Sequence, residues 1–233
     1  MGTADHDYTE RPSRIPGAVV WRRGTHRPVA SRILPDGCMD VIHRDGELFV
    51  AGPDTTAHVS LSATGERLTA VRFGPGTGPA FLRVPASELR NLRVPLQDLW
   101  PLSRVRRLTA ALDAAPDRAA ALEAALLAVD RADDPLVPHL LAHVRAGDPV
   151  AAIASEIGLS ERQLHRRGLA LYGYGLKTLE RILRLNGALD LARRGMAYAT
   201  VAAKAGYADQ AHLARDVKAL TGVPISELLK TRN

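Results

Sequence analysis

Two groups of polar side chains in the C-terminal third of this chain of 233 residues have the chemistry to recognise the edges of nucleotide bases. An arginine can donate two hydrogen bonds to guanine O6 and N7, and a glutamine can pair with adenine in the same groove. The groups are Arg162, Gln163, His165, Arg166 and Arg167, and then Gln210, His212 and Arg215. Such side chains reach bases only from a helix that fits the major groove, so the surrounding sequence must supply one.

The sequence around each group predicts a helix-turn-helix unit. In the first unit Gly158 ends a helix, and Ser160 with Gln163 forms a capping-box pattern that starts the next. In the second, Gly206 makes the turn and Asp209 is placed to cap the following helix. The apolar positions are Val150, Ile153, Ala154, Ile157 and Leu164, and then Tyr198, Val201, Ala202, Ala205 and Leu213. Asp148 is expected to cap the very first helix, with Pro149 at its first position.

One helix is expected to join the units, because residues 176–194 contain no breaker except Gly187. At 1.5 Å per residue it is about 28 Å long, which suits two recognition helices about one duplex turn apart. Lys177, Arg181 and Arg184 fall at i, i+4 and i+7 and are expected to face phosphates. A solvated helix face, helped by Glu180, is the alternative.

The excess positive charge lies in the same region. The net charge is +6, and residues 148–233 carry +5 of it, with 13 Lys and Arg against 8 Asp and Glu. A basic domain beside a nearly neutral one indicates a phosphate-binding module, although an ordinary solvated basic surface would give the same balance.

The first hundred residues predict a small antiparallel β-barrel or sandwich. Residues 38–44 and 47–51 flank Asp45-Gly46, a strong hairpin signal because both residues tolerate positive φ. Further strands are expected at 18–21, 58–62 and 67–73, short helical turns at 85–90 and 96–100, and a loose arm over 1–17.

Helices are expected from residue 103 onward. Residues 103–131 are rich in Ala, Leu and Arg with a break at Pro116-Asp117, and Pro135 and Pro138 introduce another helix to about Arg145. We therefore predict an α+β protein: a β domain over 1–102, a helical connector over 103–147 and an all-α module over 148–233. The alanine-rich helices are either a homodimer interface or simple intramolecular packing.

The C-terminal motifs resemble those of the AraC-type (AraC/XylS) transcription regulators over about residues 150–230. The matching segments are Ile153-Ala154, Gly158-Leu159-Ser160, Leu164-His165-Arg166, Gly173, and most specifically residues 205–215 with Lys218 and Gly222-Val223-Pro224. The resemblance implies a bacterial regulator that binds double-stranded DNA, with RNA polymerase as a further possible partner. It implies base contacts from Arg162, His165, Arg166, Gln210, Ala211 and Arg215; Ala211 offers only a methyl contact to thymine. By residue type we add Gln163 to the base-reading set and Arg167 and Lys218 to the phosphate-binding set.

Two positions depart from the family pattern. Gly168 stands where the family usually has Phe, and Val217 precedes Lys218 where the family usually has Phe-Lys. A glycine inside a helix costs about 1 kcal/mol relative to alanine, so we expect a looser first recognition helix.

The front half resembles the N-terminal domain of a poorly described subgroup of these regulators, similar to a shortened cupin-like barrel. The segments that carry this likeness are residues 34–40, 50–53 and 71–76. The resemblance implies binding of a small-molecule effector, or dimerisation. The sequence itself shows no ligand, and we expect no cofactor.

The sequence contains only weak indications of a metal, redox or methyl-accepting site. Cys38, Asp40, His43 and His58 are candidate metal or redox residues, but on one strand His43 faces away from Cys38 and Asp40, and a buried structural thiol explains Cys38 better. A methyl-accepting thiol would need further cysteines. Trp21 and Trp100 are expected in cores rather than against a ligand.

Enzyme signatures are missing from the sequence. There is no G-x-S-x-G motif, and residues 74–78 lack the lysine of a phosphate-binding loop, so an enzyme is not expected. A non-enzymatic adaptor or sensor is the alternative. The single cysteine and the lack of a signal peptide or long apolar segment predict a soluble cytoplasmic protein without a membrane partner.

Overall fold

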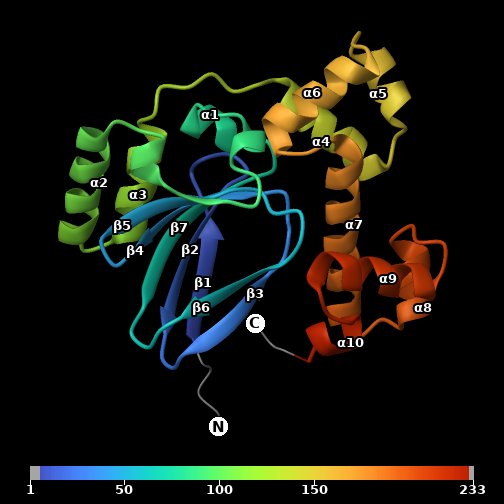
Figure 1. Ribbon diagram of the computed structural model, residues 1–233, viewed down its shortest axis with the longest axis horizontal. Helices are drawn as coiled ribbons and strands as arrows, with labels where there is room; N and C mark the ends of the chain where they lie inside the picture. The colour runs from blue at the N-terminus through green and yellow to red at the C-terminus, as the bar shows by residue number, and fades with distance from the viewer. Residues whose placement is uncertain (1–5, 231–233) are drawn as a thin grey trace.

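The computed structural model describes residues 6–230 and places a β sandwich beside an all-helical domain (Figure 1). One sheet has six antiparallel strands in the order β1-β2-β7-β4-β5-β8, and the other has two, β3-β6. The strands are β1 (His6–Pro12), β2 (Val19–Thr25), β3 (Val29–Ile33), β4 (Met39–Arg44), β5 (Glu47–Ala51), β6 (His58–Ser62), β7 (Arg67–Phe73) and β8 (Arg93–Pro95). The predicted α+β class with a small antiparallel β domain is confirmed.

The hairpin at Asp45-Gly46 is confirmed, with both residues at positive φ between β4 and β5. The strands expected around the turn at 63–66 also form, but they do not pair with each other. β6 pairs with β3 in the small sheet, whereas β7 lies between β2 and β4 in the large one. Pairing across sheets depends on the whole fold, and the local alternation of side chains does not reveal it.

The loose arm expected over residues 1–17 is wrong for residues 6–12, which form edge strand β1; residues 1–5 lie outside the described part of the chain. The strand is mostly exposed and polar, so it lacks the apolar alternation that signals a strand. Beyond its end, Ser13 and Arg14 surround the carboxylate of buried Glu123, which accepts from Ser13 Oγ and the Arg14 amide at 2.7 Å each. Burial alone would raise the pKa of Glu123, but these bonds and Arg11 lower it to about 2.

The helices predicted to form a connector pack into two different hydrophobic cores. Helices α2 (Leu102–Ala114) and α3 (Arg118–Leu127) cover the large sheet, where Leu112 and Leu122 are buried with strand residues such as Val71. Helix α4 (Leu136–Ala146) instead buries Val137, Leu140 and Val144 in the core of the first helix-turn-helix unit. The structure adds a short α1 (Gly78–Leu82) and confirms the two helical turns as η1 (Ala86–Glu88) and η2 (Leu96–Asp98).

The C-terminal domain is organised by one central helix, α7 (Leu176–Arg193). Its 18 residues span about 27 Å, as expected. Leu179 and Ile182 on its first half are buried with the first unit, and Leu185 and Leu189 on its second half are buried with the second. The first unit is α5 (Val150–Glu156) and α6 (Glu161–Tyr172); the second is α8 (Tyr198–Lys204) and α9 (Gln210–Thr221), followed by α10 (Ile225–Leu228).

The β domain lies along α7 and contacts both units. The Asn186 amide donates to the Pro35 carbonyl at 2.9 Å, the Ala57 amide donates to the Leu220 carbonyl at 2.7 Å, and Arg90 donates to the Gly173 carbonyl. The two domains are therefore joined at several points along the C-terminal helical domain. Across residues 6–230, no helix combines the length and apolarity needed to cross a membrane.

Candidate nucleic-acid interface

The two turns of the helix-turn-helix units have the same backbone geometry. Gly158 has φ +68° and Gly206 has φ +74°, in the left-handed region that favours glycine. After each glycine the chain closes back on the preceding helix, because the Leu159 amide donates to Ala154 O and the Tyr207 amide to Ala202 O, both at 2.9 Å. The repeated sequence pattern therefore reflects a repeated structure.

The expected caps of both recognition helices are confirmed. Ser160 and Gln163 form a complete capping box at the start of α6, in which Gln163 Oε1 accepts from the Ser160 amide at 2.9 Å. At the start of α9, the Asp209 carboxylate accepts from the His212 amide at 2.6 Å. These bonds satisfy amides that a helix leaves unpaired at its N-terminus.

The expected cap at Asp148 is wrong. Pro149 occupies the N-cap position of α5 with extended backbone, and the helix begins one residue later at Val150. The Asp148 carboxylate lies 2.7 Å from His143 Nδ1 on α4 instead. A charge-assisted bond to the histidine has thus replaced the weaker capping contact.

Helices α6 and α9 both have 12 residues, and each position of α6 corresponds to the position 49 residues later in α9. Leu164 and Leu213 are buried at equivalent positions, and Gly173 and Gly222 end the two helices in the left-handed conformation. Arg166 and Arg215 occupy equivalent exposed positions, and among residues 6–230 neither has a hydrogen-bond or ion-pair partner. Arg162, Gln163 and His165 on α6, and Gln210, Ala211 and Lys218 on α9, are exposed as well.

Gly168 is buried and closely packed. A Cβ atom there would lie 3.3 Å from Tyr174 O and 3.6 Å from Gly175 Cα, because the turn after α6 packs directly against the helix. Main chain therefore occupies the space that a larger side chain would need. This packing argues against the expected loosening of the first recognition helix.

Several basic residues assigned to phosphates also have partners within the protein. Arg181 pairs with buried Asp216, which accepts from the Tyr207 hydroxyl at 3.1 Å as well. The Arg184 guanidinium lies 4.8 Å from the centre of the Tyr207 ring. Lys177 Nζ lies 2.8 Å from Glu180, and Arg167 pairs with Asp134. Their phosphate contacts remain predictions, and the same is true of the base contacts.

The β domain contains a cavity of about 440 Å³ between its two sheets. Cys38, Asp40 and His58 line it, whereas His43 faces α2, where its Nε2 is 3.4 Å from Asp113, as its strand position predicted. Within residues 6–230 these side chains do not assemble a metal-ligand set. Burial, with smaller contributions from the carboxylates of Asp36 and Asp40, raises the pKa of the Cys38 thiol well above its ordinary value. The thiol is therefore protonated at neutral pH, which lowers its nucleophilicity.

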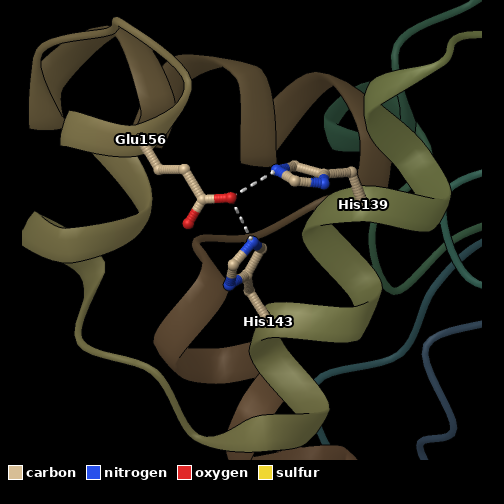
Figure 2. Close-up of side chains that lie close together, drawn as sticks. All are labelled: His139, His143 and Glu156. Carbon is tan, nitrogen blue, oxygen red and sulfur yellow. Dashed lines mark ion pairs between the residues drawn. The ribbon is translucent and has the colours of Figure 1, made fainter.

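A cluster of His139, His143 and Glu156 lies beside the first unit and was not predicted from the sequence (Figure 2). The four-residue spacing of the two histidines on one helix face was a signal. The approach of Glu156 from α5 depends on tertiary packing.

Comparisons with known proteins agree with this geometry. Residues 153–231 match a helix-turn-helix domain family, and residues 18–95 match a domain of unknown function, DUF6597. No curated protein matches the chain.

Among solved structures, the chain is similar to ToxT from Vibrio cholerae. An apo form is 12% identical with a TM-score of 0.46, covering 94% of this chain and 99% of that one. A second structure is 12% identical with a TM-score of 0.47 and 97% coverage of each chain. A ToxT structure bound to an unsaturated fatty acid is 13% identical with a TM-score of 0.45, covering 91% and 94%. On the motifs and the family match, residues 153–231 form a helix-turn-helix domain of the AraC type, a DNA-binding domain of transcription regulators, joined to a DUF6597 domain.

Proposed function

We propose that this protein is a sequence-specific transcription regulator whose helices α6 and α9 enter successive major grooves of double-stranded DNA. The observation that carries the proposal is the matched pair of Arg166 and Arg215. Both are exposed, both lack a partner among residues 6–230, and each projects from a recognition helix held at a different half of α7. An unpaired arginine at such a position can pair with guanine O6 and N7.

The other predicted DNA-contacting residues differ in the contacts that their side chains make in the free protein. Arg162, His165, Gln210 and Ala211 are exposed beside the two arginines and complete the base-reading set. The Gln163 oxygen is engaged in its cap, so only its amide group is available to a base. Lys218 would bind phosphate directly, and Arg167 and Lys177 would exchange a carboxylate partner for phosphate. Arg181 would act mainly by fixing α7 against α9, and Arg184 by packing over Tyr207 in the turn before α9.

Selection of bound sequences from a random duplex pool, followed by salt titration of the best duplex, tests this function. Enrichment of a defined sequence is expected, and log affinity should fall linearly with log salt, with a slope of about −0.9 per neutralised phosphate. No enrichment would favour a non-specific adaptor. An affinity independent of salt would contradict the phosphate contacts.

We further propose that the β domain binds a small-molecule effector in its cavity. Part of the cavity lining is apolar. It includes Trp21, Ile42 and Leu68, which are buried in one cluster against which the partly buried Phe49 packs. The Nε groups of Arg23 and Arg72 are buried without a hydrogen bond of good geometry, and both residues line the cavity. Arg72 Nε lies 3.4 Å from Asp40 and 3.7 Å from Asp36, and Arg23 pairs with Glu66. A ligand carboxylate could accept from these guanidinium groups in better geometry, so the cavity favours an apolar ligand with a carboxylate or similar acceptor.

The cavity wall also reaches the DNA-binding domain. Leu34 lines the cavity and packs against the core of the second unit, and the next residue accepts the hydrogen bond from Asn186 on α7. A ligand could therefore act on α7 through this loop. Titration with octanoate, followed by tryptophan fluorescence in a Trp100→Phe chain so that only Trp21 reports, should saturate, and binding should be weakened at least tenfold when Arg72→Met is added. An equal response to octanol, or in the variant, would contradict the proposal.

A further inference from the structure

Three side chains from two helices converge beside the first helix-turn-helix unit. His139 and His143 lie one turn apart on α4, and Glu156 is the last residue of α5. Glu156 Oε1 lies 3.4 Å from His139 Nε2 and 3.3 Å from His143 Nε2, and Figure 2 shows this oxygen pointing between the two rings. One ligand atom from each residue lies within 4.8 Å of the others.

A fourth residue fixes the protonation of one histidine. The Asp148 carboxylate lies 2.7 Å from His143 Nδ1, and because a carboxylate can only accept, Nδ1 must carry the proton. In a neutral His143 ring, the lone pair of Nε2 then faces Glu156 Oε1. This is the arrangement by which a carboxylate orients a metal-binding histidine.

These contacts also fit a state without a metal ion. A His143 ring protonated on both nitrogens donates to Asp148 and to Glu156, and these two carboxylates raise its pKa above the ordinary value. A divalent ion would take the place of the Nε2 proton and balance both carboxylates while the two rings stay neutral.

We propose that His139, His143 and Glu156 bind a divalent transition-metal ion of the zinc class. Imidazole nitrogen with carboxylate oxygen suits Zn²⁺ and its neighbours rather than Mg²⁺ or Ca²⁺, which prefer oxygen ligands alone. In a tetrahedral zinc site with bonds of about 2.0–2.2 Å, neighbouring ligand atoms are about 3.3 Å apart, close to the two distances to Glu156. The His139 side chain is 42% exposed and that of Glu156 55%, so water can complete the coordination.

The ion would join two helices that the chain connects only through residues 147–149. Helix α4 shares a core with α7, and α5 carries the first turn of the DNA-binding module. A metal bridge would hold α5 against α4 and so stabilise the first unit, whereas the second unit has no matching cluster among the described residues. This inference needs only metal binding and does not depend on the proposed DNA site.

Calorimetric titration of the full chain, without a purification tag and stripped by a chelator, tests the site with Zn²⁺ as the probe. We expect one ion per chain and a melting temperature raised by a few degrees. Co²⁺ should give the intense visible absorption of a tetrahedral site. His143→Gln or His139→Gln should weaken Zn²⁺ binding at least 100-fold, and Asp148→Asn should weaken it about 10- to 100-fold.

His26→Gln is the matched control, because His26 also pairs with one carboxylate, Asp7, but has no second histidine. It should bind Zn²⁺ like the wild-type chain. Circular dichroism of each variant checks that the fold is kept. Zn²⁺ binding that is absent in the wild-type chain, or undiminished in the variants, would overturn the proposal and leave the cluster as an ion pair.

Discussion

The two helix-turn-helix units share their framework and differ on the surface that each recognition helix presents. Buried leucines, a polar N-cap and a left-handed terminal glycine recur at equivalent positions of α6 and α9. At the outer face, Arg162 and His165 of α6 correspond to Ala211 and Ala214 of α9. Residues that make the fold are repeated, whereas of the residues that would meet bases only the arginine pair Arg166 and Arg215 is repeated, so we expect the two units to read different half-sites.

The units are also held in place differently. The position occupied by Arg167 in α6 is occupied by Asp216 in α9. Arg167 reaches out to Asp134, before α4, whereas Asp216 is buried and ties α9 to Arg181 of α7 and to Tyr207. Equivalent positions of α6 and α9 thus carry side chains of opposite charge, and each side chain connects its unit to a different part of the protein.

Exchanging the core residues at equivalent positions 168 and 217 should have the largest effect. Gly168→Val would force a side chain against the Tyr174 carbonyl, and we expect a loss of about 2–3 kcal/mol in the free energy of unfolding. Val217 is fully buried, and Val217→Gly should cost about 3 kcal/mol through a cavity and lower helix propensity. Urea unfolding measures both. A stabilised Gly168→Val variant would show that the first helix is loosely packed after all.

Removing the matched arginines tests whether both units read bases. Arg166→Ala and Arg215→Ala should each cost about 1–3 kcal/mol on the selected duplex and relax one position, each in its own half-site. Lys218→Ala is the control for a phosphate contact, and it should weaken all sequences alike. Anisotropy titrations on a panel of single-base variants give the comparison. Uniform weakening by Arg215→Ala would refute its base contact.

The anchoring residues should differ in their contribution to stability. Asp216→Asn removes the charge that faces Arg181 and should cost about 1.5 kcal/mol, since Asp216 is buried and also bound to Tyr207. Asp134→Asn should cost about 0.5 kcal/mol or less, because Arg167 is exposed. Thermal unfolding of the two variants provides the measurement. Equal losses would mean that the two anchors do not differ as described.

The caps should show a modest effect and the closest agreement between the units. Ser160→Ala and Asp209→Ala each leave an amide at a helix start unpaired and should cost about 1 kcal/mol. Chemical denaturation of both variants checks the values. A cost confined to one variant would show that only one recognition helix depends on its cap.

Local sequence predicted the parts of the fold that local bonds determine. The hairpin at Asp45-Gly46, the turns at Gly158 and Gly206, and the caps of α6 and α9 follow from backbone preferences of a few residues, so the sequence revealed them. Strand β1 was missed because its outward side chains carry no apolar pattern.

Features that depend on distant segments could not be predicted in the same way. The pairing of β6 with β3 and the packing at Gly168 depend on residues outside the local pattern. For the candidate interface, residue type suggested the exposed arginines, whereas the partners of Arg181 and Arg184 appeared only in the folded chain.

Inserting base pairs between the two selected half-sites tests most directly whether α6 and α9 occupy successive major grooves on one face of DNA. Helix α7 fixes the separation of the units, so a spacer of about 5 bp, half a helical turn, should place one half-site on the opposite face. We predict that affinity then falls to that of a single half-site. Unchanged affinity after the insertion would contradict the simultaneous engagement of both helices.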